Sequence, residues 1–176
     1  MYSNPKFNIV GVCDVNIEGA QNLAERYSTL SFKTIGEAIE SLGVRGDNAD
    51  GCNTSIDGVV ICSPSFTHGE IIHTAASHRL PMFVEKPVDE TADKIDELFN
   101  VCEKHGAKLC CGFQRRFDDS YVAVAEAVKN GSIGNPISAN IFFADHPCPP
   151  IEFLLTGGDI FMDLCVSLFS CVYIFL

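Results

Sequence analysis

The chain has 176 residues, of which 47% are hydrophobic and 20% charged, the ordinary composition of a globular protein. Its formal net charge of −11 argues against nucleic acids and anionic membranes as partners, because both attract basic surfaces. The 9 cysteines form no CxxC pair, and no apolar leader follows Met1, so we expect reduced core thiols in a cytoplasmic protein. The cysteines that lie in apolar runs, and for which we expect burial, are Cys13, Cys62, Cys110 and Cys111.

The first part of the chain predicts alternating strands and helices. Residues 8–14 form an apolar run that ends on Asp14, which predicts a buried strand. Asn16 is a suitable N-cap for the helix that follows. The elements predicted after this helix are a short extended piece near Phe32, a helix over residues 34–42 and a surface loop over residues 43–55.

A strand–helix–strand unit occupies the middle of the chain. Residues 57–62 predict a buried strand, and residues 82–85 predict a second strand buried on both faces, which Pro87 would end. Units of this kind are nearly always right-handed, with parallel strands. The other elements predicted here are helices over residues 69–78, 91–105 and 120–129 and a strand over residues 108–113.

The sequence around Pro136 marks a predicted domain boundary. Residues 137–144 after it predict a strand that pairs with a new partner, because no crossover helix precedes them. The apolar run over residues 164–176 is too short for a membrane span and indicates a buried helix or strand. We therefore expect one domain over residues 1–134 and the start of a second over residues 135–176.

Polar side chains follow the predicted strands of the first domain. Because the carboxyl ends of parallel strands meet at one edge, where open α/β sheets bind ligands, we expect these side chains to share a crevice. Asp14 favours a ribose diol, and hence NAD over NADP, but an acid that only starts a helix fits the sequence equally well. Simpler alternatives also remain for His68, as a surface residue, and for Glu85-Lys86, as a surface ion pair. The residues at these strand ends are Asp14, Ser63, Pro64, His68, Glu85, Lys86, Gln114 and Arg115.

Asp163 is a further candidate because it lies in an apolar segment after two glycines. A buried acid costs several kcal/mol unless it has a partner. In a helix, position 167 would lie one turn away on the same face, and a histidine there would form an acid–base pair with Asp163. The residue at that position is Ser167.

The motifs that carry a family resemblance are Asp14, Ser63-Pro64, Glu85-Lys86-Pro87, Gly112-Phe-Gln-Arg-Arg and Asp163. Together they resemble those of the Gfo/Idh/MocA oxidoreductases, and among them the inositol 2-dehydrogenases. The resemblance covers about residues 7–166. It implies an NAD(P)-binding Rossmann domain, and then an α+β domain whose open sheet carries substrate contacts and an oligomer interface. The implied reaction is hydride transfer from a CH–OH group of a polyol or sugar.

The resemblance also implies roles for individual residues. Lys86 would contact the nicotinamide and the substrate hydroxyl, and Asp163 would orient a catalytic histidine. The implied substrate contacts are Gln114 and Arg115, and no metal is implied. The residues implied to bind NAD are Asp14, Ser63, Pro64, His68, Glu85 and Lys86.

Three departures from the family pattern shape the expectation for this chain. No GxGxxG loop precedes residues 8–14, Ser167 replaces the base, and the match ends near residue 167. The predicted fold class is therefore α/β, an incomplete doubly wound, Rossmann-like parallel sheet that lacks its first strand, followed by the start of an α+β domain. A shortened gene model, a splice form or a fragment would give this pattern. We expect these residues alone to bind NAD weakly and not to turn over substrate.

Besides an incomplete family oxidoreductase, two hypotheses remain open from the sequence. One is a non-catalytic remnant or splice form that acts as a binding module, and the other is an unrelated α/β binding domain.

Overall fold

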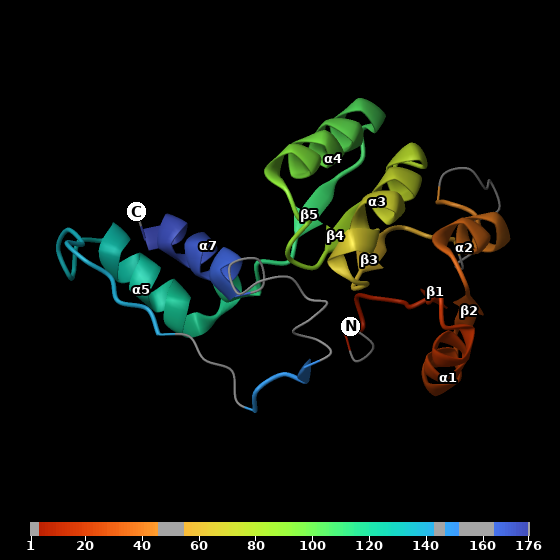
Figure 1. Cartoon of the computed structure of the whole chain (residues 1–176), viewed down its shortest axis with the longest axis horizontal. Helices are drawn as coiled ribbons and strands as arrows, with labels where there is room; N and C mark the ends of the chain where they lie inside the picture. Colours follow the sequence, from red (N-terminus) through yellow and green to blue (C-terminus); the bar gives the residue numbers. More distant parts are fainter. Residues whose placement is uncertain (1–3, 46–54, 143–146, 152–163, 176) are drawn as a thin grey trace. The chain divides into compact units, whose positions relative to one another are not determined.

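The computed structural model describes residues 4–45, 55–142, 147–151 and 164–175 (Figure 1). The chain divides into two compact units. The first unit consists of Met1–Ile61, Gly69–Phe83 and Glu97–Leu109, and the second of Cys62–His68, Val84–Asp96 and Cys110–Leu176. No helix among the described residues has the length and apolar character needed to cross a membrane.

Strands and helices alternate along most of the described chain (Figure 1). The strands are β1 (Gly11–Cys13), β2 (Leu30–Phe32), β3 (Val59–Ile61), β4 (Met82–Val84) and β5 (Leu109–Cys111). The α-helices are α1 (Ile17–Tyr27), α2 (Ile35–Leu42), α3 (His68–Ser77), α4 (Ala92–His105), α5 (Asp119–Lys129) and α7 (Val166–Phe175), with the 3-10 helices η1 (Ser65–Thr67) and η2 (Gln114–Phe117).

A two-stranded parallel sheet forms one end of the first unit. β1 pairs with β2, Gly11 opposite Leu30, and α1 packs on both strands. The predicted cap of α1 is confirmed, because Asn16 Oδ1 accepts a hydrogen bond from Gly19 N at 3.2 Å. Ser28 ends the helix in the left-handed region, at φ 52°.

The second sheet has the order β3-β4-β5, with α3 and α4 as its crossovers. The strands are parallel, as the sequence predicted. In β4 and β5, Met82 N donates to Lys108 O and Gly112 N donates to Val84 O, so the partner numbers rise together. The predicted α/β fold class is confirmed, with the strands divided between two sheets.

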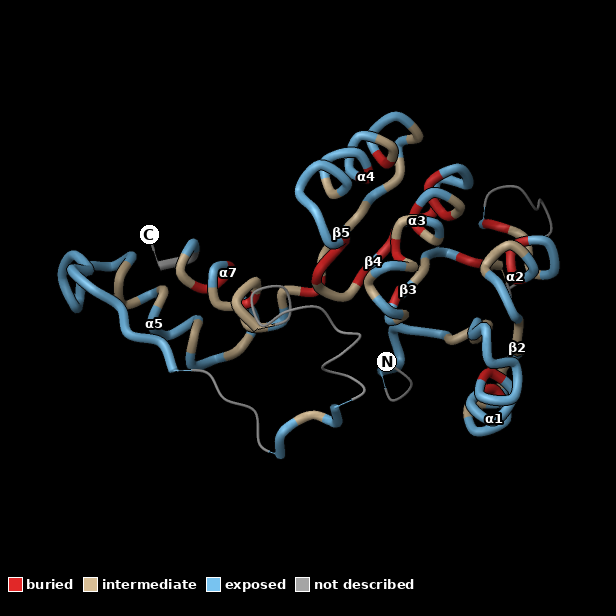
Figure 2. The backbone as a smooth tube through the Cα atoms, viewed as in Figure 1, coloured by how far each residue is buried: buried red, intermediate tan, exposed pale blue. Residues whose placement is uncertain are grey.

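The expectation that β4 is buried on both faces is wrong. Val84 is fully buried, but Phe83 is 37% exposed, and Val60 in β3 is also exposed. Successive side chains of a strand point to opposite faces. The described residues therefore cover one face of this sheet and leave the other open (Figure 2).

Part of the apolar core of the first unit lies under α3. Ile72, Ala75 and Ala76 are completely buried, and Leu80 is nearly so. Ile72, Ala75 and Ala76 recur at helical spacing and form the inward face of α3, and Leu80 follows the end of the helix. Figure 2 shows this buried stripe along α3.

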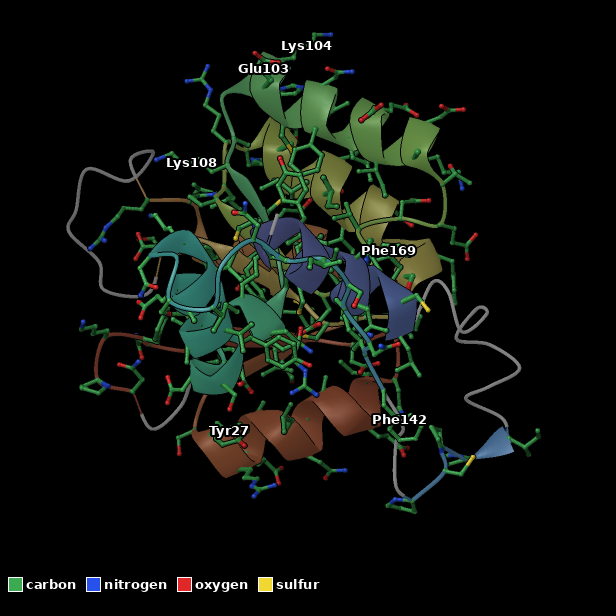
Figure 3. The ribbon with its side chains drawn as sticks, turned by 90° about the vertical axis from the view of Figure 1, so that its left-hand side faces the viewer. Tyr27, Glu103, Lys104, Lys108, Phe142 and Phe169 are labelled. Atoms are coloured by element: carbon green, nitrogen blue, oxygen red, sulfur yellow. The ribbon has the colours of Figure 1, made fainter. Side chains whose placement is uncertain are left out.

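In the second unit, α7 packs against η2 and α5. Its buried side includes Ser167, Ser170 and Cys171, while Phe169 is 70% exposed (Figure 3). Arg116 Nε donates to Ser170 Oγ at 2.7 Å, which joins η2 to α7. The apolar run near the end of the chain is thus a helix, one of the two alternatives that the sequence left open.

Two further expectations are corrected. Residues 137–142 form no strand, because no neighbouring strand is present to accept their backbone hydrogen bonds within the described part of the chain. Cys13, Cys62 and Cys110 are exposed and Cys111 is half-buried, all as free thiols, because apolar neighbours in sequence do not place a residue on the covered face.

Candidate functional site

The turn that follows β3 is fixed by short hydrogen bonds. Thr67 Oγ1 lies 2.6 Å from Ser63 Oγ and 2.7 Å from Pro64 O. Thr67 N also donates to Pro64 O, which closes η1 directly before α3. The sequence predicted this helix over residues 69–78, whereas the structure begins α3 at His68, directly after η1. Ser63 is half-buried and Pro64 is exposed.

The turn that follows β4 carries the charged pair. Glu85 and Lys86 are half-buried, and the Lys86-Pro87 peptide bond is cis. Lys86 N donates to Glu85 Oε2 at 3.3 Å. Asp89, which is buried, accepts from Glu90 N at 2.7 Å and lies 3.5 Å from Lys94 Nζ. The charged pair therefore sits on a turn whose continuation is buried.

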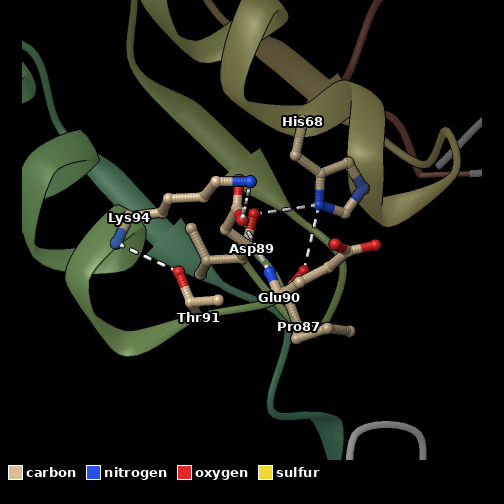
Figure 4. Close-up of polar contacts among 7 residues, drawn as sticks. His68, Pro87, Asp89, Glu90, Thr91 and Lys94 are labelled. Carbon is tan, nitrogen blue, oxygen red and sulfur yellow. Dashed lines mark hydrogen bonds and ion pairs between the residues drawn. The ribbon is translucent and has the colours of Figure 1, made fainter. Parts of the chain in front are cut away.

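His68 joins these two turns, and Figure 4 shows its contacts with the turn that follows β4. Its Nδ1 lies 3.0 Å from Pro87 O and 3.2 Å from Val88 O, and its Nε2 lies 2.9 Å from Ser63 O. The side chain is 1% exposed. The ends of β3 and β4 are thus brought together within the second unit by one imidazole ring.

The Glu85 carboxylate also acts on two thiols at neighbouring strand ends. Cys62 is exposed as a residue, but partial burial of its thiol, and next the negative charge of Glu85, raise its pKa above the ordinary value. Burial, then Cys110 and Glu85, raise the pKa of Cys111 to about 11. This shared influence places Glu85 near the thiols at the ends of β3 and β5.

We expect Glu85→Gln to speed alkylation of Cys62 and Cys111 by iodoacetamide about twofold to fivefold at pH 8. Glu85 disfavours the thiolate, so removing its charge lowers both pKa values and increases the reactive fraction. Peptide mass spectrometry over time measures each rate. Glu90→Gln is the matched control, since Glu90 does not contribute to either pKa shift. Unchanged rates in Glu85→Gln would mean that Glu85 does not face these thiols.

The two predicted substrate residues begin η2. Gln114 is exposed and Arg115 is half-buried. Arg115 pairs with Asp118 at 3.6 Å, and its guanidinium lies 5.8 Å from the centre of the Tyr121 ring. These contacts hold the Arg115 side chain along the start of α5, at the strand end that follows β5.

Asp14 belongs to the first unit, and Ser63, His68, Glu85 and Lys86 belong to the second. The convergence of Asp14 with these four residues stays a prediction. Asp14 is exposed at the end of β1, and its Oδ1 accepts from Asn16 N at 2.8 Å. An exposed carboxylate at the end of a parallel strand fits a ribose diol. Asp163 lies outside the described residues.

Sequence reasoning missed the contribution of Asp89 and of the carbonyl groups of Pro87 and Val88. Asp89 comes two residues after Pro87 and is followed by Glu90, so its neighbours in the sequence do not mark it as a buried acid. The carbonyl groups carry no sequence signal, because every residue has one.

Comparison with known proteins agrees with this geometry. The family profile described as an oxidoreductase family with an NAD-binding Rossmann fold, GFO_IDH_MocA, matches residues 1–113. The chain is 32% identical over 167 residues to inositol 2-dehydrogenase from Rhizobium meliloti (strain 1021), covering 95% of this chain and 47% of that protein. It is 33% identical over 116 residues to myo-inositol 2-dehydrogenase from Thermotoga maritima, covering 66% and 35%. The crystal structure of a myo-inositol dehydrogenase from Corynebacterium glutamicum aligns with a TM-score of 0.75 at 27% identity, covering 99% and 49%.

The parallel strands, their helical crossovers and the polar turns at the strand ends define a Rossmann-type α/β protein. The chain belongs to the Gfo/Idh/MocA oxidoreductase family, which confirms the resemblance inferred from its motifs. It spans between about a third and a half of the length of the curated relatives it matches.

Proposed function

We propose that the whole protein is an NAD-dependent oxidoreductase that acts on a CH–OH group of a polyol or sugar, of the inositol 2-dehydrogenase kind. The observation that carries this proposal is the Glu85-Lys86-Pro87 turn, which follows β4 in a chain of this oxidoreductase family. The names of its relatives from Rhizobium meliloti and Thermotoga maritima support an inositol-like substrate.

The residues present fit the proposed cofactor. The exposed Asp14 carboxylate suits a ribose diol, and its negative charge would repel the extra phosphate of NADP. Ser63, Pro64 and Glu85 would line the nicotinamide side, with His68 beneath them. Bound NAD would supply the hydride acceptor. The Lys86 ammonium would hold the reacting hydroxyl and stabilise negative charge that develops on its oxygen.

On the substrate side, we assign Gln114 and Arg115 to the polyol hydroxyls and Asp163 to the orientation of a proton acceptor. Ser167 is buried in α7. A serine hydroxyl without an adjacent base takes no proton near neutral pH, so turnover needs an acceptor other than Ser167. We further propose a homo-oligomer in the cytoplasm, supported by the family resemblance and by the free thiols of the described residues.

Calorimetric titration with NAD and an inositol-dependent NADH assay on the whole protein test the proposal. Saturable NAD binding together with inositol oxidation is the expected result. A whole protein that binds no NAD, or that oxidises no polyol or sugar, would refute it.

We expect Asp14→Asn to weaken NAD binding about tenfold to a hundredfold, because a charge-assisted hydrogen bond to the ribose is lost. NADP binding should not weaken, so the preference of the protein for NAD over NADP becomes smaller. Asparagine keeps the Oδ1 that accepts from Asn16 N, so the start of α1 should survive. Titration with both cofactors measures the change, and Asp96→Asn, at an exposed site on α4, is the control. Equal weakening toward NAD and NADP would contradict the ribose contact.

A further inference from the structure

His68 is the largest polar side chain among the fully buried residues of the described chain. Its partners are three main-chain carbonyl oxygens, those of Ser63, Pro87 and Val88. A carbonyl oxygen only accepts hydrogen bonds, and a neutral imidazole carries one N–H group. Two of the three carbonyl groups face Nδ1, which favours the tautomer with its proton on Nδ1. A buried polar group held by such contacts is costly to remove, because the carbonyl groups would lose their partner.

The contacts of His68 fall on both sides of the backbone around the charged turn. Two residues before Lys86, Val84 O accepts from Gly112 N at 2.7 Å, which holds the end of β4 against β5. One residue after Lys86, Pro87 O lies 3.0 Å from His68 Nδ1. The backbone that carries Lys86 is therefore fixed at both ends over a span of four residues.

The downstream end of this span depends on His68. Pro87 has no backbone N–H, so its carbonyl is the one main-chain group with which it can hold the turn. Pro87 and Val88 are buried, and their carbonyl groups meet the ring rather than solvent. The other ring nitrogen lies 2.9 Å from Ser63 O, and the turn at Ser63 is closed by Thr67.

We propose that His68 is a positioning residue for Lys86. Through Pro87 O it sets where the Lys86 backbone lies, and through Ser63 O it ties that position to the end of β3. The proposal rests on the role given to Lys86 in the proposed function. In this proposal His68 acts on the site through Lys86 and does not touch the substrate.

Two conservative substitutions test the contacts of the two ring nitrogens one at a time. The amide nitrogen of asparagine falls near the place of Nδ1, so His68→Asn keeps a donor for Pro87 O and loses the contact with Ser63 O. The amide nitrogen of glutamine falls near Nε2, so His68→Gln keeps the Ser63 contact and loses the Pro87 contact. His73→Gln, at an exposed histidine of the same helix α3, is the matched control.

Amide hydrogen exchange of the whole protein, resolved by residue, is the first measurement. We expect His68→Gln to speed exchange of the Lys86 and Glu90 amides about tenfold. We expect His68→Asn to leave these two amides within about threefold and to speed exchange of the Thr67 amide instead. The second measurement is the rate of Lys86 acetylation divided by the rate of Lys94 acetylation. This ratio should change severalfold in His68→Gln and stay unchanged in His68→Asn and His73→Gln.

The proposal is overturned if both His68 variants change exchange at Lys86 and Glu90 equally, if neither changes it, or if exchange rises uniformly along the chain. If His68→Gln does not fold, His68→Asn still decides, because faster exchange at Lys86 in that variant contradicts a link through Pro87. NAD titration of the unaltered protein judges the proposed function separately. A protein that binds no NAD but shows the expected exchange pattern would support the link from His68 to Lys86 and refute the proposed reaction.

Discussion

Alanine in place of Lys86 is expected to lower kcat for polyol oxidation by the whole protein about 10²- to 10⁴-fold. Under the proposed function, the Lys86 ammonium lies against the reacting hydroxyl, and alanine leaves the developing charge without this partner. Initial rates of NADH formation at varied inositol and NAD concentrations separate kcat from KM. We expect the loss mainly in kcat, because the interaction strengthens as charge develops.

Lys94→Ala is the matched control for Lys86→Ala. Lys94 belongs to the same stretch of chain, but its side chain is 58% exposed and pairs with Asp89 at 3.5 Å. The Lys94 ammonium has no part in the proposed reaction, so the control should keep its kcat within about threefold. A Lys86→Ala protein that retains full kcat would exclude Lys86 from the reaction.

The helix ends could be predicted from the sequence because their chemistry is local. Asn16 accepts from Gly19 N three residues later, and Gly106 takes the left-handed conformation, φ 71°, that ends α4. Both interactions need only the residue type and a few neighbours in the chain. The parallel arrangement of β3, β4 and β5 could be predicted in the same way, because helical spacing appears between apolar runs.

The coverage of the sheet could not be predicted in this way. The residues of β4 are Met82, Phe83 and Val84, and an all-apolar run indicates a strand buried on both faces. Phe83 is nevertheless exposed, because what packs on each face is decided by segments far away in the chain. The same reason explains why Cys110, in an apolar run, is exposed while Cys102, in a helix rich in charged residues, is buried.

Residues 137–142 show the corresponding limit for strands. Their β-branched and aromatic side chains favour extended backbone, but a strand exists only where a second strand accepts its hydrogen bonds. The candidate site follows the same rule. The strand-end positions of Ser63, Glu85 and Lys86 could be predicted from the chain, whereas the contacts of His68 could not, since its partners are carbonyl groups.

Ile72→Ala is expected to destabilise the protein by about 2–5 kcal/mol, which is the range for a large side chain removed from a packed core. Ile72 is fully buried on the inward face of α3, beside Ala75 and Ala76, so the surrounding small side chains cannot move in to fill the space. The adjacent Ile71 offers a matched control, because Ile71→Ala removes the same atoms from the same helix at a half-buried position. Urea unfolding followed by circular dichroism gives both free energies. Ile71→Ala should cost less than half as much as Ile72→Ala, and equal costs would mean that α3 does not bury the face described here.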